Sequence, residues 1–368
     1  MTNILLECIG TMPSYDLTVR DFKRYSTILP FRFRAKHSRY ISSSDMEWCD
    51  ILVSLRGNNP LSAYLAEKAQ NLGKKIILIL DDDLIEYNSF DHPYINKLAK
   101  ESLLRVLNVA EIMITTSRYL GDKYKKNYGV NYALLDTILD PEEIDPPKAP
   151  SDRIKIVYAA GSEHCVFFNE IVKPSLSKLS EWYADRISLT FIGTHVDVGN
   201  VSFPVEYVKT MPFVEYQKYM RKTRFDIGLA PLSDTELCRS KYYNKYIEYT
   251  KHGICGIYSN LLPFNIVVKD GVNGVLSENK TDKWTNAISK LIDNELLRQQ
   301  CVDKAVHQLE ADFSLKTVAG KLKSQISYID TFKAVSKRVY FMRQMYLFLA
   351  FCEARRRFLN KFMNKKLL

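Results

Sequence analysis

Several features that mark common protein classes are missing from this sequence of 368 residues. Its seven cysteines are widely spaced and form no Cys-x-x-Cys pair, which disfavours a disulfide framework and a zinc site alike. Glycine and proline are also sparse, at 14 and 13 residues, so a collagen-like or low-complexity chain is excluded. No apolar run reaches the ~18–20 residues that span a bilayer, and the N-terminus lacks the basic region of a signal peptide. The sequence therefore predicts a folded cytoplasmic protein with reduced thiols.

Three short motifs that are mechanical requirements of particular chemistries are absent as well. There is no Gly-x-Gly-x-x-Gly after a first strand, which argues against a dehydrogenase with a nicotinamide cofactor. There is no Gly-x4-Gly-Lys-Ser/Thr either, which argues against a P-loop enzyme. The Gly-x-Ser-x-Gly motif is likewise missing.

Positive charge is concentrated at the C-terminal end of the chain. The formal net charge is +10. Residues 331–368 hold ten basic residues and one acid, Glu353, and so carry +9 of this total. The first 330 residues are nearly neutral, and nucleic-acid binding by the whole protein is therefore not indicated.

Continuous apolar runs alternate with helical patterns along residues 1–330, which indicates parallel sheets covered by helices on both faces. We expect strands at 4–9, 50–55, 75–80, 111–116, 154–160, 187–192, 225–230 and 254–258, and helices at 60–72, 96–109, 169–183, 242–250, 283–293 and 295–309. Four of the thirteen prolines fall within 141–152, a composition that suits a linker. The predicted fold class is α/β with two doubly wound domains, 1–146 and 152–330, and a tail at 331–368.

One block in the second half is distinctive: FDIGLAPLSDTELCRSKYYNKYIEYTKHGICGIYSN at 225–260, followed by DGVNGVL at 270–276. This block resembles the nucleotide-sugar-binding domain of GT-B-fold glycosyltransferases, in the family-4-like group 1 of the bacterial surface-polysaccharide type. Weaker likeness extends to GKKIILILDDDL at 73–84 and AEIMITTSRYL at 110–120. The resemblance implies two Rossmann-like domains facing a cleft, with the acceptor on 1–146 and the donor on 152–330. It also allows the last helix of the second domain to cross back to the first.

Basic residues stand where the resemblance places the donor. A nucleoside diphosphate-sugar carries about two negative charges, which basic side chains and helix-start N–H groups can match without a metal. Arg239, Lys241 and Lys245 lie at the start of the expected 242–250 helix, and solvated surface lysines are the alternative explanation. The resemblance assigns Glu248 to the donor's ribose hydroxyls, whereas an ion pair with a neighbouring lysine is the alternative. At the position of the family's other donor-site glutamate this chain has Ser240.

The turn after the first strand of the second domain is the other expected part of the donor site. Gly161 and Ser162 form a small turn whose N–H groups can approach a phosphate, and the resemblance places this turn beside the diphosphate. His164 is a candidate phosphate donor. A glycine also ends many strands, and His164 serves equally well as an ordinary loop residue.

Acidic residues and one histidine are the candidates for acid–base chemistry in the first domain. Asp81, Asp82 and Asp83 follow an apolar strand, but consecutive side chains point in different directions and cannot all bind one metal. We expect Asp82 or Asp83 to serve the acceptor or to act as general base, with N-capping of the next helix as the alternative. His92 is the other candidate base, because histidine transfers protons near neutral pH. The resemblance implies that neither a metal nor a cofactor is needed.

Two basic surfaces remain. Residues 20–39 contain seven basic residues with interleaved aromatics, a pattern that fits a nucleic-acid surface, a membrane-facing edge for a lipid-phosphate acceptor, or a plain solvated surface. In the tail, Phe358, Leu359, Phe362 and Met363 recur at helical spacing among basic residues, as in helices that lie on anionic membranes. Packing against a domain or a second chain is the alternative for this tail.

These observations lead to one function and one alternative. The expected function is transfer of a sugar from a nucleotide-diphosphate donor to a lipid-linked or growing cell-surface glycan. The enzyme is expected to lie at the inner face of the cell membrane, held by residues 331–368, with no nucleic-acid partner. The alternative is a noncatalytic GT-B-like scaffold of a polysaccharide assembly complex, which Ser240 favours.

Overall fold

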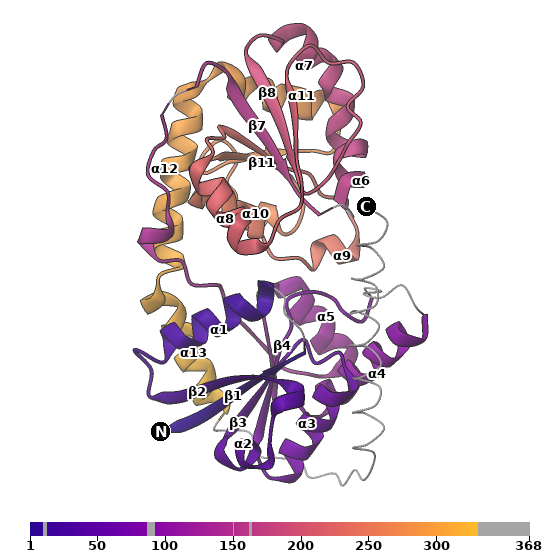
Figure 1. Cartoon of the computed structure of the whole chain (residues 1–368), viewed down its shortest axis with the longest axis vertical. Coiled ribbons are helices and arrows are strands. Elements are labelled where there is room, and N and C mark those ends of the chain that lie inside the picture. The colour runs from indigo at the N-terminus through magenta and orange to yellow at the C-terminus, as the bar shows by residue number, and fades with distance from the viewer. Residues whose placement is uncertain (10–12, 87–92, 150, 162–163, 330–368) are drawn as a thin grey trace. The chain divides into compact units, whose positions relative to one another are not determined.

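The computed structural model describes residues 1–9, 13–86, 93–149, 151–161 and 164–329. They form two compact units. Among the described residues, those up to 137 and those of 315–329 make unit 1, and those of 138–314 make unit 2. In each unit helices cover a parallel sheet, so the predicted α/β class is confirmed (Figure 1).

Unit 1 contains a six-stranded parallel sheet with the order β2-β1-β3-β4-β5-β6. Its strands are β1 (Thr2–Cys8), β2 (Phe31–His37), β3 (Ile51–Leu55), β4 (Lys75–Ile79), β5 (Ile112–Thr115) and β6 (Tyr132–Leu134). Its helices are α1 (Pro13–Tyr25), α2 (Ser43–Trp48), α3 (Pro60–Asn71), α4 (Pro93–Val109), α5 (Arg118–Tyr128) and α13 (Leu315–Ile329). All five residues of the central strand β3 are buried, as a strand covered on both faces requires. The last described helix, α13, belongs to this unit and contacts α1.

Unit 2 contains a second six-stranded parallel sheet with the order β12-β11-β10-β7-β8-β9. Its strands are β7 (Ile154–Ala159), β8 (Ile187–Ile192), β9 (Val205–Val208), β10 (Ile227–Ala230), β11 (Cys255–Ser259) and β12 (Val275–Ser277). Its helices are α6 (Cys165–Phe167), α7 (Leu176–Tyr183), α8 (Phe213–Lys222), α9 (Glu236–Arg239), α10 (Asn244–Lys251), α11 (Thr281–Asp293) and α12 (Glu295–Asp312). Numbered within the unit, this order is 3-2-1-4-5-6, the arrangement of dinucleotide-binding folds.

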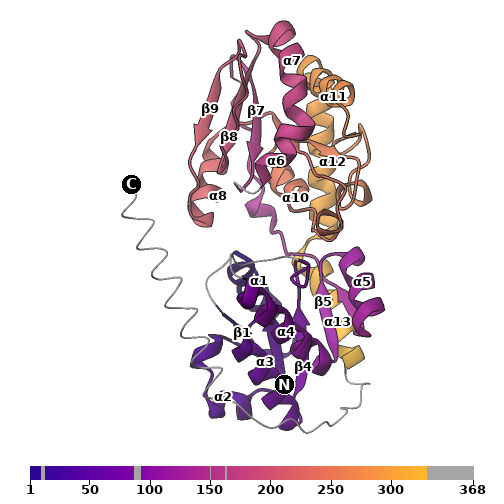
Figure 2. The same ribbon diagram turned by 90° about the vertical axis from the view of Figure 1, so that its right-hand side faces the viewer.

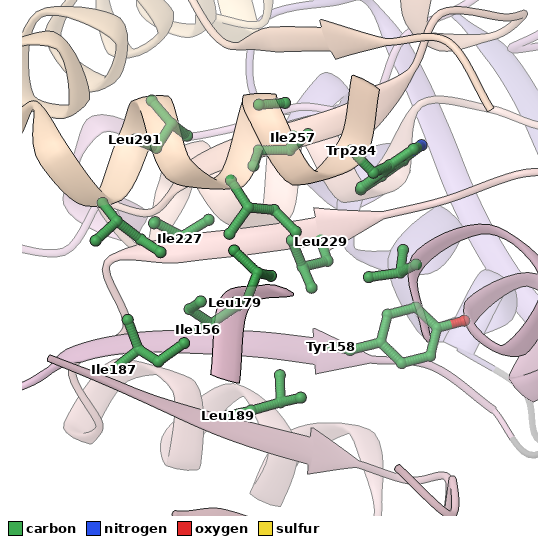
Figure 3. Packing of buried hydrophobic residues seen from close by; sticks show 14 of the residues in the cluster. Ile156, Tyr158, Leu179, Ile187, Leu189, Ile227, Leu229, Ile257, Trp284 and Leu291 are labelled. Carbon is green, nitrogen blue, oxygen red and sulfur yellow. The ribbon is translucent and has the colours of Figure 1, made fainter. Parts of the chain in front are cut away.

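Alternation along the strands of unit 2 builds two cores, one on each face of the sheet. Ile156 and Tyr158 of β7 join the cluster under α7 and α11, whereas Val157 and Ala159 join the cluster with residues of α8 and α10. Figure 2 shows α7 and α11 on one side of this sheet and α8 on the other. In Figure 3, Trp284 of α11, which is fully buried, and other side chains of the α7 and α11 layer lie over the strand residues.

The helix expected at 169–183 is interrupted. Residues Phe168–Val172 form a π-helical turn and Lys173–Ser175 a 3₁₀ turn before α7 begins at Leu176. Pro174 accounts for the break, because proline lacks an N–H and its ring clashes with the preceding turn of an α-helix.

The proline-rich stretch expected as a linker belongs to unit 2, which the chain enters at Ile138. The side chain of Asp145, which is 1% exposed, holds this stretch to the rest of unit 2. It contacts His252 Nδ1 (2.8 Å), Lys148 Nζ (3.1 Å) and Arg221 Nε (2.9 Å). Burial by itself would raise the pKa of Asp145, but the hydrogen bonds from His252, Lys148 and Arg221 outweigh it and lower the pKa. Burial lowers the pKa of His252, despite the contact with Asp145, which by itself would raise it. The boundary expected at 146–152 therefore differs from the division at Ile138, and Asp145 and Lys148 are bonded within unit 2.

Within the described ranges, none of the helices has both the length and the apolar character that crossing a membrane requires.

Candidate functional site

The carboxyl edge of the sheet in unit 2 is the first place to look for a ligand. β7 and β10 are neighbours, but the chain leaves β7 toward β8 on one side and β10 toward β11 on the other. The loops after the two strands therefore diverge, and ligands of such sheets bind at this switch point. Gly161, predicted at the phosphate turn, follows β7 here and is exposed. Ser162, predicted beside it, lies outside the described residues.

The loops after β7 and β8 touch at a glycine. Gly193 has φ +80°, and a Cβ built on it would lie 2.7 Å from the Ala160 carbonyl oxygen. Only glycine fits both the backbone angle and the space. On the other side of this turn, the Thr210 hydroxyl donates to the Gly193 carbonyl oxygen (3.2 Å). The strand ends of β7, β8 and β9 are thus held together.

His164 lies in the loop that follows. Its ring stacks on Phe167 at 5.4 Å between centroids, and its carbonyl accepts a hydrogen bond from the Tyr158 hydroxyl (2.8 Å). These contacts fix the loop in place. The role predicted for His164 as a phosphate donor stays a prediction.

A hydrogen-bond network around the buried Ser259 fixes the loops after β10, β11 and β12. Ser259 Oγ accepts from the Leu232 N–H (2.8 Å) and donates to Asn279 Oδ1 (2.7 Å). Asn279 Nδ2 in turn donates to the Leu232 carbonyl (2.7 Å). Asn279 was not anticipated from the sequence, although an amide just after a short strand is a signal that could have found it.

Helix α10 is anchored to the sheet by Tyr249. This side chain is fully buried, and its hydroxyl donates to the Leu229 carbonyl (2.8 Å). The ring packs on β10 at Gly228, where an added Cβ would lie 2.5 Å from ring atoms. Since a helix that follows a parallel strand starts at the carboxyl edge, this anchor sets the start of α10 beside the switch point.

Replacing Gly228 with Ala is expected to destabilise unit 2 by about 1–3 kcal/mol, because the methyl group must displace a packed ring. Thermal unfolding measures the loss. Gly320→Ala is the matched control, since a Cβ at this helical glycine meets nothing within 4 Å and alanine favours helix. Equal melting temperatures for Gly228→Ala and the unsubstituted protein would contradict the packing described for Tyr249.

Lys245 and Glu248, both predicted donor residues, form an ion pair on α10. Lys245 Nζ lies 2.8 Å from Glu248 Oε1, and the Tyr216 hydroxyl donates to the same oxygen. Lys245 Nζ also lies 5.8 Å from the ring centroid of Tyr216 and 5.6 Å from that of Tyr249. Burial, with the nearby Glu248 carboxylate, raises the pKa of Tyr216 well above its usual value, so its hydroxyl remains a donor. The ion pair that was the alternative for Glu248 is thus present. Glu248 Oε2 has no hydrogen-bond partner within the part of the chain that the structure covers.

Three residues shortly before α10 differ in their surroundings: Arg239, Ser240 and Lys241. Arg239 Nε pairs with Asp234 Oδ1 (2.7 Å) on the surface. Ser240 is buried, and its hydroxyl donates to the Glu236 carbonyl (2.8 Å). Lys241 is half-buried and has no ion pair with any described residue. Of the predicted basic residues, Lys241 is therefore the one whose ammonium is not already matched by a carboxylate.

The acidic candidates of unit 1 are bound to basic residues. Arg56, which follows β3 with φ +67°, pairs with Asp81 (2.8 Å) and with Asp82 (3.2 Å). Burial would raise the pKa of Asp81, but Arg56 outweighs it and the pKa is lowered. Arg56 was not anticipated from the sequence, since nothing local to residue 56 signals a partner 25 residues away.

Asp83 differs from its two neighbours. It is fully buried, with Lys123 Nζ 2.9 Å from Oδ2 and the Tyr124 hydroxyl donating to Oδ1 (3.0 Å). These contacts fasten α5 to the end of β4. Because the Asp83 side chain is fully buried, it is not accessible to an acceptor, and of the three aspartates we retain Asp82 as a candidate base. His92 lies outside the described residues.

A search of the described residues finds no group of three or more His, Cys, Asp or Glu side chains placed to hold a metal ion.

Comparison with known proteins rests on structure alone. No protein-family model matches the chain, and no curated protein matches it. HepE of Anabaena, solved in complex with UDP-glucose, has a TM-score of 0.63 at 11% identity over 89% of this chain and 100% of that chain. A glycosyltransferase from Rickettsia africae ESF-5 has a TM-score of 0.61 at 13% identity, covering 90% and 99%. The lipopolysaccharide outer core galactosyltransferase WaaB, in its apo form, has a TM-score of 0.59 at 14% identity, covering 89% and 99%.

The chain has the GT-B fold. The similarity covers nearly the full length of each of these chains, and the two six-stranded sheets are the two Rossmann-like halves that the sequence block at 225–276 predicted. The predicted fold class is therefore confirmed. Within the GT-B fold, unit 2 has the 3-2-1-4-5-6 sheet and carries Gly161, Lys241, Lys245 and Glu248 on the loops and helix that follow its strands.

Proposed function

We propose that this protein is a glycosyltransferase that moves a sugar from a nucleotide-diphosphate donor, bound on unit 2, to a lipid-linked or growing cell-surface glycan. One observation carries the proposal. Lys241, which has no ion pair with any described residue, and the Lys245–Glu248 ion pair lie around the first turns of α10. This helix follows a strand at the switch point of a 3-2-1-4-5-6 sheet. That HepE, with the same fold, was solved with UDP-glucose and with UDP supports this class of donor. WaaB, named as a lipopolysaccharide galactosyltransferase, supports a cell-surface glycan as acceptor.

Each donor-site residue then has a distinct role. The diphosphate is bound by Lys241, by Lys245 and by N–H groups at the start of α10 and at the Gly161 turn, with Ser162 and His164 as further donors from the same loop. Glu248 Oε2 accepts a hydrogen bond from a ribose hydroxyl, while Oε1 stays bonded to Lys245 and Tyr216. Arg239 contributes from the rim once it leaves Asp234. We propose that these positive groups replace a metal and that no cofactor takes part.

The reaction exchanges one bond for another. The bond between the sugar's anomeric carbon and the phosphate oxygen breaks, and a bond from that carbon to an acceptor hydroxyl oxygen forms. The electron pair leaves with the nucleoside diphosphate, whose charge Lys241 and Lys245 stabilise. The acceptor's proton passes to a general base, for which we propose Asp82 or His92.

We further propose that the protein works at the inner, cytoplasmic face of the cell membrane. Support comes from residues 331–368, which lie outside the described residues and carry +9. Basic residues near an anionic bilayer contribute roughly 1 kcal/mol each, so a tail of this charge is enough for peripheral binding without a spanning helix.

A thermal-shift screen tests the donor site first. One of UDP, GDP, dTDP, CMP and ADP, at 100 times its dissociation constant, is expected to stabilise the protein by about 2.7 kcal/mol, which raises its melting temperature on the order of 5 °C. The shift should be the same with and without magnesium, because basic residues match the charge. Glu248→Gln should reduce it, and Glu278→Gln, at an exposed carboxylate, should not. Flat curves for all five nucleotides would contradict the donor site.

One observation favours a second function, that of a noncatalytic scaffold in a polysaccharide assembly complex. Ser240 stands at the position of the family's second donor-site glutamate, and its buried hydroxyl is used by the Glu236 carbonyl. The scaffold predicts no nucleotide stabilisation and no release of nucleoside diphosphate from any nucleotide sugar. Stabilisation together with release would reject it.

A further inference from the structure

A groove in unit 1 lies between α1 and the edge strand β2. At its Tyr15 end α1 adjoins the acidic residues that follow β4, because the hydroxyl of the neighbouring Ser14 donates to Asp81 Oδ2. The groove has a volume of about 540 Å³. Part of its wall is apolar, formed by Tyr15 and Val19 of α1 and by Phe31 and Phe33 of β2. The polar part comes from Lys23, Ser26 and Arg32. We call it the α1–β2 groove.

The charge around this groove is one-sided. Residues 13–40 contain seven basic and two acidic residues, so they carry +5, whereas the rest of the first 330 residues is net negative. Four of the seven bind acids within unit 1: Arg20 and Arg24 contact Asp21, and Arg34 and Lys36 contact Asp45. A fifth, Arg39, stacks on Tyr40 at 4.7 Å.

The two remaining basic residues are those of the groove. Lys23 and Arg32 are exposed, and neither forms an ion pair with any residue that the structure describes. The two basic residues of this surface without an ion-pair partner therefore both line the groove, beside its apolar side chains.

We propose that the α1–β2 groove binds the phosphate headgroup of a membrane lipid, with the phosphate between Lys23 and Arg32 and the adjoining part of an acyl chain along Val19 and Phe33. A membrane lipid carries a negatively charged phosphate next to an apolar acyl chain. The basic residues of the groove can bind the phosphate, and its apolar side chains can contact the acyl chain. The groove would give unit 1 its own contact with the bilayer, independent of the tail and of the donor site, and so goes beyond the proposed function.

The aromatic residues of the same surface argue against nucleic acid. Phe22, Tyr25 and Phe31 are buried at 3%, 1% and 5% exposure. Binding of a single strand relies on exposed rings on which bases stack. The aromatic residues at 22, 25 and 31 are therefore core residues of unit 1. Phe33 is half-buried, and Tyr40, at 63% exposure, is paired with Arg39.

The test uses the full chain and the double variant Lys23→Gln/Arg32→Gln. Lys125→Gln/Lys126→Gln is the matched control, because these two exposed lysines lie on α5 beside β5 and β6, at the opposite edge of the same sheet. Binding is measured by calorimetry to dihexanoyl phosphatidic acid below its micelle concentration and by sedimentation with vesicles of phosphatidylcholine and phosphatidylglycerol. The groove variant is expected to bind both about 10- to 30-fold more weakly, and the control variant to match the unsubstituted protein.

Three results would overturn the proposal. One is equal lipid binding by the groove variant and the control, which would leave the charges as a device against edge-to-edge strand pairing. Another is inorganic phosphate that binds as tightly as the short-chain lipid with the same loss in the variant, which would identify a site for free phosphate. The third is a loss confined to a single-stranded oligonucleotide. The nucleotide thermal shift of the groove variant should remain unchanged, so failure here is distinct from failure of the donor site.

Discussion

Replacing Lys241 with Ala is expected to weaken binding of the matching nucleoside diphosphate by about 10- to 100-fold, because a charge-assisted hydrogen bond to phosphate is lost. Lys241 should matter more than Lys245, whose ammonium already has a carboxylate partner 2.8 Å away. Calorimetric titration with the diphosphate and with the nucleoside alone measures the effect. Only the diphosphate should bind more weakly, since the base and ribose do not reach a lysine assigned to the phosphates.

The control for this experiment lies at the far end of α10, the helix that Lys241 precedes. Lys251→Ala removes the same side chain at the far end of α10, where Lys251 Nζ contacts Gln217 (2.7 Å), and should leave both affinities unchanged. Turnover should follow affinity, with slower release of nucleoside diphosphate from the nucleotide sugar in Lys241→Ala. Unchanged affinity in Lys241→Ala, or an equal loss for the nucleoside, would remove this residue from the phosphate site.

Asp145→Ala is expected to lower the free energy of unfolding of unit 2 by about 3–5 kcal/mol, because it leaves buried positive charge without its partner. Lys148 Nζ, which also donates to the carbonyls of Met220 (2.8 Å) and Thr223 (3.1 Å), would lose its only carboxylate among the described residues. Guanidinium unfolding measures the total loss. Hydrogen exchange of the amides at 138–148 shows where it falls.

Two further variants make the result specific. Asp152→Ala removes an exposed carboxylate a few residues further along the chain and should change the stability by less than about 0.5 kcal/mol. Asp145→Asn keeps part of the hydrogen bonding and should fall between the two. A loss below about 1 kcal/mol in Asp145→Ala, or protection at 138–148 that does not change, would show that this cluster does not hold the segment.

Local patterns in the sequence carried much of the fold. The apolar runs at 75–80 and 187–192 predicted strands that the structure has at Lys75–Ile79 and Ile187–Ile192. Burial on both faces favours apolar residues at most positions of such strands, so the pattern is recognisable within five or six positions. The four edge strands β2, β6, β9 and β12 were not among the predicted ones, because a strand that is paired on one side only is more exposed and has a weaker apolar pattern.

Some contacts of the candidate site residues could likewise be predicted from the sequence, and others could not. Lys245 and Glu248 are three residues apart on one helix, so the sequence places them on one face without any knowledge of the fold. Arg56 and Asp81, or Asp145 and His252, meet only because distant segments pack together, and no local pattern carries that information.

What the sequence by itself determined is the α/β class, the GT-B resemblance of 225–276, the order of the candidate donor-site residues along the chain and the location of the +9 charge in the tail. Each of these depends on residues close together in the chain. Only the tertiary structure decided that unit 2 begins at Ile138, that Asp83 is a buried ion-pair partner and not an exposed base, and that Lys23 and Arg32 are left unmatched beside an apolar groove. Ion pairing and burial depend on which segments meet in the folded chain. The residue type alone therefore could not show whether a carboxylate or a basic group has an ion-pair partner.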